Sequence, residues 1–98
     1  PMQVFWIIHD LVDYNAWNDH RIETASKRSS FLEEHGVRNI RQLQNIEDIN
    51  DIISVVIAPS RDILIALLLE PWPQETFANS AIYRGIPKIL GPFTPINL

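Results

Sequence analysis

The chain has 98 residues, a net charge of −4 and no cysteine, and almost half of its residues are hydrophobic. This length fits a single domain, residues 1–98, that buries a limited share of its surface, so we expect a partner subunit to cover leftover apolar area. The lack of cysteine excludes disulfides and thiolate chemistry, and the lack of a lysine- or arginine-rich run argues against nucleic-acid and anionic-membrane partners.

The apolar run near the start of the chain meets His9 and Asp10 after a few residues. It is too short for a membrane span and has no basic leader, so we expect neither a signal peptide nor an anchor, and a cytoplasmic location. Pro1 precedes Met2, an order that favours Pro1 as an added residue and Met2 as the natural start. The alternative is that Pro1 is a secondary amine that acts as a base, as in the tautomerases, which also begin with proline and an apolar strand.

The first predicted strand covers residues 4–8, which are β-branched or aromatic on both faces. Such a strand is typically covered on both sides. His9 stands where this strand stops, and Asp13 is a suitable N-cap for the following helix. We expect that helix over residues 14–35, with Gly36 ending it.

At about 100° per residue, the apolar side chains of the first helix gather on one side. This predicted core face consists of Tyr14, Trp17, Ala25, Phe31 and Leu32, with Ile22 at its margin.

Two further strands are expected in the middle of the chain. Residues 37–45 form the weaker candidate, and residues 46–51 have the acidic and asparagine side chains of a turn. Residues 52–58 are a near-continuous β-branched run, which predicts a central strand buried on both faces.

The second half of the chain begins a helix after that strand. Ser60 or Asp62 can cap a helix over residues 63–70, and Pro71 and Pro73 are expected to interrupt it.

A continuation of that helix is expected over residues 74–84, with Gly85 ending it. The tail over residues 86–98 contains three prolines, so any strand around residues 88–90 should lie at a sheet edge or an interface.

The predicted order is strand, helix, strand, strand, helix and short strand. This order fits a ferredoxin-like α+β sandwich whose helices cover one face of the sheet. Because the first and third strands are apolar on both sides, the second face needs a cover as well, which a symmetric copy of the same sheet supplies. We therefore predict a homodimer.

Several motifs together resemble small uncharacterised members of the dimeric α+β barrel superfamily. They are His9-x-Leu11-Val12-Asp13-Tyr14-x-x-Trp17, then Gly36-Val37, an acidic turn before an aliphatic strand, and Arg84-Gly85-Ile86-Pro87. The resemblance implies a dimer whose two sheets face each other, with a ligand cavity between each sheet and its helices. That superfamily includes antibiotic-biosynthesis monooxygenases, muconolactone isomerases, polyketide cyclases, haem-degrading enzymes and domains that only bind ligands. The resemblance therefore transfers no single catalytic residue.

Three cationic side chains fall inside the apolar arc of the first helix. Arg21, Arg28 and His35 share the side marked by Trp17 and Leu32. They point either into the sheet–helix cavity, where a guanidinium could hold a carboxylate or a developing enolate, or past the edge of the core into solvent. Arg28 is the favoured ligand contact of the three.

His9 is the natural candidate for a general acid or base, because the unperturbed pKa of histidine lies near neutrality. Asp10 or Asp13 could orient it, and His20 could converge on the same opening. The alternative is a hydrogen-bonded structural histidine. His9, Asp13 and His20 include metal-ligand types, but their spacing matches no compact ligand motif, so no metal is expected.

Aromatic side chains could line the same pocket. We expect Tyr14, Trp17, Trp72 and Tyr83 to form its walls, although each also suits an ordinary core. With only three glycines the chain has no phosphate-binding loop and no nucleophile elbow, which argues against a nucleotide or flavin held by a dedicated motif.

The sequence thus predicts a small enzyme of the isomerase, cyclase or monooxygenase type, without a bound metal or organic cofactor. Its substrate would be a hydrophobic, partly anionic or enolisable small molecule, with His9 moving a proton and Arg28 stabilising negative charge. The alternative is a non-catalytic ligand-binding or dimeric interaction protein in which both residues are structural.

Overall fold

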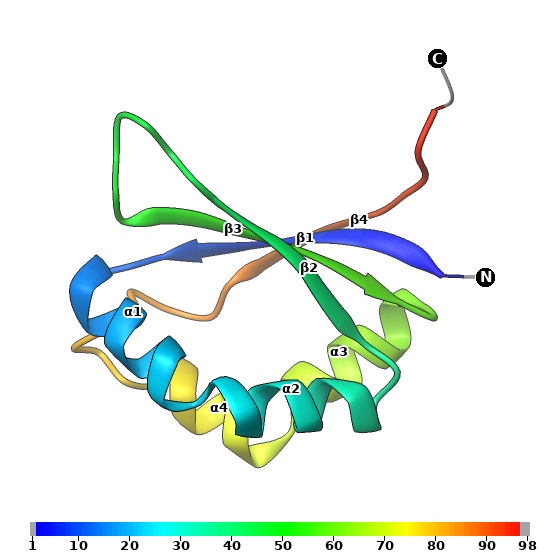
Figure 1. Cartoon of the computed structure of the whole chain (residues 1–98), viewed down its shortest axis with the longest axis horizontal. Coiled ribbons are helices and arrows are strands. Elements are labelled where there is room, and N and C mark those ends of the chain that lie inside the picture. Colours follow the sequence, from blue (N-terminus) through cyan, green and yellow to red (C-terminus); the bar gives the residue numbers. More distant parts are fainter. Residues whose placement is uncertain (1, 97–98) are drawn as a thin grey trace.

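A four-stranded antiparallel sheet forms one layer of the computed structural model, which describes residues 2–96. In chain order, the elements are β1 (Gln3–Asp10), α1 (Tyr14–Glu23), α2 (Ala25–Glu34), β2 (Arg38–Gln44), β3 (Asp51–Ala58), α3 (Arg61–Leu68), α4 (Pro71–Phe77) and β4 (Lys88–Phe93). The strand order across the sheet is β2-β3-β1-β4. All helices lie on one face of the sheet (Figure 1). The predicted α+β class is therefore confirmed.

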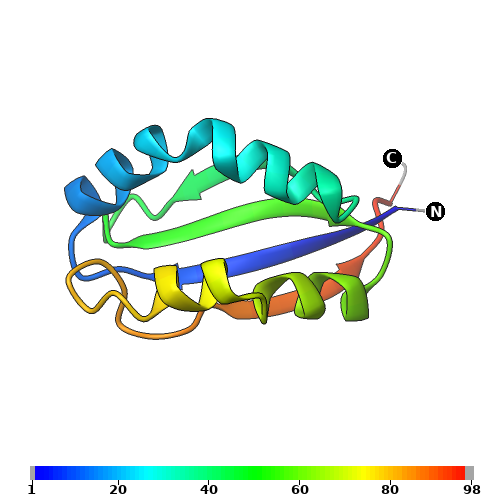
Figure 2. The same ribbon diagram turned by 90° about the horizontal axis from the view of Figure 1, so that it is seen from below.

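The helices form two rows beneath the sheet. Figure 2 shows α1 and α2 as one row and α3 and α4 as the other, with the strands visible between them. None of the helices in the part of the chain that the structure describes is long and apolar enough to cross a membrane.

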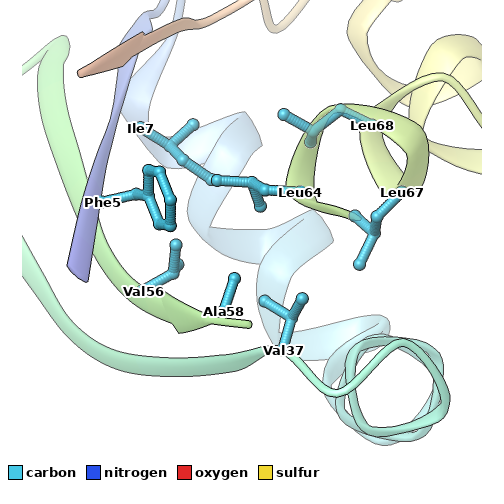
Figure 3. Close-up of a cluster of buried hydrophobic side chains, with 8 residues drawn as sticks. All are labelled: Phe5, Ile7, Val37, Val56, Ala58, Leu64, Leu67 and Leu68. Carbon is cyan, nitrogen blue, oxygen red and sulfur yellow. The ribbon is translucent and has the colours of Figure 1, made fainter. Parts of the chain in front are cut away.

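The larger part of the core lies between the sheet and α3. Phe5 and Val56 face each other across the central strands β1 and β3, and Leu64 is fully buried against this side. Figure 3 shows the cluster, which consists of Phe5, Ile7, Val37, Val56, Ala58, Leu64, Leu67 and Leu68. Because side chains alternate along a strand, every second residue of β1 and β3 faces the helices.

The other face of the sheet is mainly apolar and has no covering layer within residues 2–96. We call it the open sheet face; its apolar residues are Val4, Trp6, Ile8, Leu43, Ile53, Val55, Ile57, Leu90 and Phe93, and Arg38 and Arg41 of β2 share it at the edge of the sheet. Trp6 is 38% exposed and Phe93 is 46% exposed, and their ring centroids are 6.0 Å apart. Within one chain, β1 and β3 are thus covered on the helix side alone.

The first predicted helix is divided at Thr24. Asp13 is its N-cap, as expected, and accepts a hydrogen bond from the Ala16 N–H at 3.2 Å. The Thr24 hydroxyl donates to the His20 carbonyl at 2.8 Å, a side-chain bond to the preceding turn that bends helices. The continuous helix was therefore wrong, and so was Ala25 as part of its core face, because Ala25 is exposed; Ile22, predicted at the margin of that face, is 62% exposed.

The end of α2 follows the expected pattern. Gly36 adopts a φ of +69°, which favours glycine, and its N–H donates to the Glu33 carbonyl. The Val37 N–H donates to the Leu32 carbonyl at 2.9 Å, so the chain turns directly into β2.

The expected helix over residues 74–84 was wrong. The helix is interrupted before Pro71, as expected, since α3 ends at Leu68 and Glu70 is extended. Pro71 then begins α4, because the first turn has N–H groups without partners and loses little when one is missing. The helix ends at Phe77, and the Asn79 side chain accepts from the Ala81 N–H at 3.1 Å in a local turn. Gly85 therefore ends no helix.

The helix α3 and the two edge strands agree with the sequence-based predictions. Ser60 caps α3 by accepting from the Ile63 N–H at 3.2 Å. Strand β2 forms one edge of the sheet, and β4 forms the other, as its prolines predict.

Candidate functional site

A cavity of about 130 Å³ lies between the sheet and the two helix rows. The sheet contributes Ile7, His9, Asn39, Gln42, Ser54 and Val56. The first helix row contributes Trp17, His20, Arg21, Arg28, Phe31 and Leu32, together with Thr24, which links its two helices. The second row and the segment after it contribute Leu67, Leu68, Trp72, Pro73, Thr76, Phe77 and Tyr83. An apolar cavity of about 150 Å³ is large enough to bind benzene. The site therefore accommodates a molecule built on one ring.

His9 sits on the floor of this cavity and is only 7% exposed. Its Nε2 lies 3.0 Å from the Ser54 hydroxyl, which donates to the Gln42 side-chain oxygen at 2.7 Å. Because the Ser54 hydroxyl donates its proton to Gln42, it must accept a hydrogen bond from Nε2–H of His9, and the free lone pair of His9 is on Nδ1. The direction of both hydrogen bonds follows from the orientation of the Gln42 amide, which places its oxygen toward Ser54. Among residues 2–96, Nδ1 is buried and finds no hydrogen-bond partner.

Burial controls the protonation of His9. Removal from water lowers its pKa from 6.5 to about 4, because the charged imidazolium is the form that loses most from desolvation. The rings of Trp17, Phe77 and Tyr83 surround it, with centroids 6.3, 6.2 and 6.0 Å from its own. At neutral pH, His9 is an uncharged imidazole with an unsatisfied acceptor nitrogen.

Arg28 and Arg21 bring positive charge to the same cavity. An Arg28 nitrogen donates to the Arg21 carbonyl at 2.9 Å and to the Thr24 hydroxyl at 3.2 Å. The pKa of Arg28 is lowered by burial first and by the Arg21 charge second, while Tyr83 acts in the opposite direction. Two guanidinium groups are therefore held near each other in partly desolvated positions.

No aspartate or glutamate is among the residues of 2–96 that line the cavity. Arg21 donates from Nε and Nη2 to the Asn18 side-chain oxygen, at 3.3 and 2.7 Å, and its guanidinium lies 5.3 Å from the Trp17 ring centroid. Among residues 2–96, salt bridges join His35 to Glu70 and Arg84 to Asp10, both outside the cavity. Neither of them neutralises Arg21 or Arg28. In a chain of net charge −4, this local excess of positive charge favours an anionic ligand.

Aromatic contacts connect the two helix rows over part of the site. The Phe31 and Trp72 rings meet edge to face with centroids 5.3 Å apart. Lys27 lies 4.5 Å from the centroid of the Trp72 ring, a cation–π contact. Burial raises the pKa of Tyr83 to about 12, with Trp17 and Arg28 partly opposing that rise, so its hydroxyl stays protonated.

The structure gathers most of the sequence-derived candidates. His9, Arg21, Arg28, Trp17, Trp72, Tyr83 and His20 all line the cavity. Tyr14 does not; its ring packs beside Trp17 at 5.8 Å between centroids, in a neighbouring core cluster. His35 also lies outside, where its Nε2 is 3.4 Å from a Glu70 carboxylate oxygen.

Neither aspartate expected to orient His9 does so. Asp10 pairs with Arg84 on the surface, and Asp13 caps α1. Since side chains alternate along β1, the residue after His9 must point to the opposite face of the sheet. In the described part of the chain, no three histidine, aspartate or glutamate side chains cluster as metal ligands would.

The sequence interpretation missed the polar partners of His9. Ser54 is the one polar residue in the run Ile52-Ile53-Ser54-Val55-Val56-Ile57, and a lone hydroxyl in a buried strand signals a specific partner. Gln42 could not be found in this way, because the strand register shifts between Asn39 and Arg41. That irregularity decides which β2 side chains face the cavity.

Comparison of the chain with protein-family models and with curated protein sequences finds no match. The function of the cavity is therefore inferred from its own geometry.

Proposed function

We propose that the protein is a small enzyme that transfers a proton on a ring-sized, partly anionic or enolisable molecule bound between the sheet and the helices. The supporting observation is a single cavity that combines an uncharged His9, whose buried Nδ1 has no partner among residues 2–96, with two guanidinium groups that no carboxylate neutralises there. Isomerisation, cyclisation and cofactor-independent oxygenation all begin with such a proton transfer.

His9 is the base in this proposal. Its pKa of about 4 keeps it fully unprotonated at neutral pH, so Nδ1 is available to accept a proton. When a C–H proton moves from the substrate to Nδ1, the bonding electron pair moves onto the adjacent carbonyl oxygen and forms an enolate. Negative charge on the substrate raises the pKa of the nearby imidazole, which favours the transfer.

Arg28 stabilises the enolate oxygen in the same scheme. A partly desolvated guanidinium interacts more strongly with developing negative charge than one in water. Where a carbon–carbon double bond is conjugated with the enolate, return of the proton from His9 to the far carbon of that double bond shifts the double bond and completes an isomerisation. The Ser54 hydroxyl holds the imidazole through Nε2 and so keeps Nδ1 available.

A second candidate function is ligand binding without catalysis. The same low pKa that keeps His9 unprotonated also makes it a weak base, and its unpartnered Nδ1 would simply accept a hydrogen bond from a bound hydroxyl or N–H.

Deuterium exchange separates the two candidates. Phenylpyruvate carries a ring, a carboxylate and an enolisable carbon, and exchange at that carbon in D₂O is followed by NMR. The proposal predicts that the protein accelerates exchange and that His9→Ala abolishes the acceleration while phenylpyruvate still binds. Ser80→Ala, an exposed change outside the cavity, is the matched control. Binding without acceleration by the unmodified protein supports the second candidate, and loss of binding in His9→Ala would mark His9 as structural.

We also propose that the chain has the ferredoxin-like arrangement of the dimeric α+β barrel superfamily and pairs with a second copy through the open sheet face. The strand order β2-β3-β1-β4 and the placement of all helices on one face support the arrangement. The half-exposed Trp6, Leu90 and Phe93 support the pairing, because contiguous apolar surfaces mark interaction sites. The native mass spectrum tests it: a dimer is expected, and a monomer at micromolar concentration would overturn it.

The cytoplasmic location expected from the sequence is likewise a proposal. Fractionation of cells that make the protein naturally would test it, with recovery in the periplasmic or membrane fraction as the contrary result.

A further inference from the structure

The turn between β2 and β3 projects beyond the open sheet face. In Figure 1 it rises on the side of the sheet away from the helices. We call residues 45–51, the turn together with the first residue of β3, the hairpin loop. Within it, Ile46 is 98% exposed and Ile49 is 57% exposed, so two large apolar side chains stand in solvent beside an apolar surface. A second sheet packed on the open sheet face would meet this loop.

The hairpin loop is acidic. It contains Glu47, Asp48 and Asp51 and no lysine or arginine, so it carries three negative charges near neutral pH. Asp51 lies two residues before Ile53 on β3, and because side chains alternate along a strand, it shares the open sheet face with Ile53. The loop therefore brings negative charge to one end of that face.

Arg38 and Arg41 bring positive charge to another part of the same face. They lie opposite Ile57 and Val55 of β3, and both are exposed. Neither belongs to the two salt bridges that form within residues 2–96. At about 3.3 Å per residue along β3, these arginines are about 13 Å and about 20 Å from the level of Asp51. The acidic loop and the basic β2 edge therefore do not neutralise each other within one chain.

Such a face can be complementary to itself. In a twofold pair, any contact from the loop of one copy is repeated by the loop of the other copy. The direction of the twofold axis decides whether each loop meets the β2 edge or the β4 edge of its partner. The β4 side offers Lys88 and Arg84, but Arg84 already lies 3.5 Å from an Asp10 carboxylate oxygen. The β2 edge offers two guanidinium groups that no carboxylate pairs with inside residues 2–96, so it is the better match.

We propose that the protein pairs with a second copy so that the acidic hairpin loop of each contacts Arg38 and Arg41 of the other, with Ile46 packed at the same contact. The pair then has two equivalent charge clusters, one at each side of the interface. Burial of the apolar residues supplies the attraction, and the charges fix the orientation of the two sheets. This inference rests on the proposed pairing through the open sheet face, to which it adds the parts of the two copies that meet.

Charge-reversed variants that complement each other test the orientation. The loop variant is Glu47→Arg/Asp51→Arg, which keeps Asp48 because its carboxylate accepts a backbone hydrogen bond at 3.0 Å within the turn. The edge variant is Arg38→Glu/Arg41→Glu. Either variant alone places like charges together in both clusters, so native mass spectra should show its dimer weakened by about tenfold or more.

An equimolar mixture of the loop variant and the edge variant should restore the dimer as a mixed pair. In that pair, the reversed loop of one copy meets the reversed edge of the other, and the two natural regions meet in the second cluster. The two variants differ in mass, so the spectrum distinguishes the mixed pair from either variant paired with itself.

The matched control is Arg84→Glu/Lys88→Glu, which makes the same change in net charge as the edge variant at exposed positions on the β4 side. It should form less mixed dimer with the loop variant than the edge variant does. Equal or greater mixed pairing with the control would overturn the inference, as would undiminished dimers of both the loop and the edge variant. A monomeric natural chain would overturn the pairing itself, whereas a dimer indifferent to these charges overturns the orientation alone. Melting temperatures confirm that all three variants fold.

Discussion

Protonation of His9 is predicted to destabilise the folded protein as the pH falls. The imidazole is buried, and its pKa is lowered from 6.5 to about 4, so between these values the unfolded chain binds a proton that the folded chain does not. Its stabilising contribution is therefore complete above pH 6.5 and is lost as the pH falls through 6.5 toward 4. At 1.36 kcal/mol per pKa unit, the full loss is about 3 kcal/mol, of which about 2 kcal/mol has occurred at pH 5.

His9→Gln removes this titration while keeping a side-chain N–H that can donate to Ser54. Urea unfolding at one protein concentration is measured at pH 7.5 and pH 5 for both proteins. His35 has a raised pKa, chiefly because it bonds to the Phe31 carbonyl, so it stabilises the fold at low pH; it is present in both proteins and cancels from the comparison. The free energy of unfolding should fall between the two pH values by about 2 kcal/mol more in the natural chain than in the variant. Equal pH dependence in the two proteins would refute a buried, unprotonated His9.

Three further changes test the fold and the assembly. Gly91→Ala should lower the free energy of unfolding by about 2 kcal/mol or more, because Gly91 has a φ of +124° and an added Cβ would meet the Val4 carbonyl oxygen at 2.9 Å. Gly85→Ala, which meets nothing within 4 Å, should be nearly neutral, and equal losses would contradict the steric argument. Ser60→Ala should cost about 1 kcal/mol in urea unfolding through loss of the N-cap of α3, and an unchanged midpoint would show that the cap is not needed. Trp6→Glu should convert the proposed dimer to a monomer in sedimentation velocity, since a charge on an apolar interface loses hydration without a partner; a persistent dimer would place the interface elsewhere.

Local chemistry was enough to predict much of the fold. The β-branched runs located β1 and β3, and Asp13, Gly36 and Ser60 each occupy the cap position that their side chain or flexibility suggests. These features depend on a few neighbouring residues, so the sequence states them directly.

The errors arose where competing local interactions decide the outcome. The helical pattern through Thr24 is continuous in sequence, but the bond from its hydroxyl to the His20 carbonyl bends the chain there. Pro71 can either break a helix or begin one, and the choice depends on where the preceding helix ends. Asn79 then ends α4 through its own turn, which hydrophobic spacing does not reveal.

The candidate site was predictable only in part. His9, Arg21 and Arg28 attract notice as polar residues on apolar elements, so the sequence suggests them. Their arrangement depends on residues far apart in the chain: Ser54 lies 45 positions from His9, and Gln42 reaches Ser54 from another strand. Those contacts follow from strand register, which the sequence does not specify at the irregular part of β2.

The central claim, that the cavity binds an anion through Arg28, is tested most directly by comparing benzoate with benzamide. The two molecules have nearly the same shape and differ in charge, so the ratio of their affinities isolates the guanidinium contribution. Calorimetry should give a preference for benzoate of about tenfold or more in the natural chain, in keeping with the strength of charge-assisted hydrogen bonds, and a much smaller preference in Arg28→Gln. Equal binding of the two molecules to the natural chain, or a preference that persists undiminished in Arg28→Gln, would contradict it.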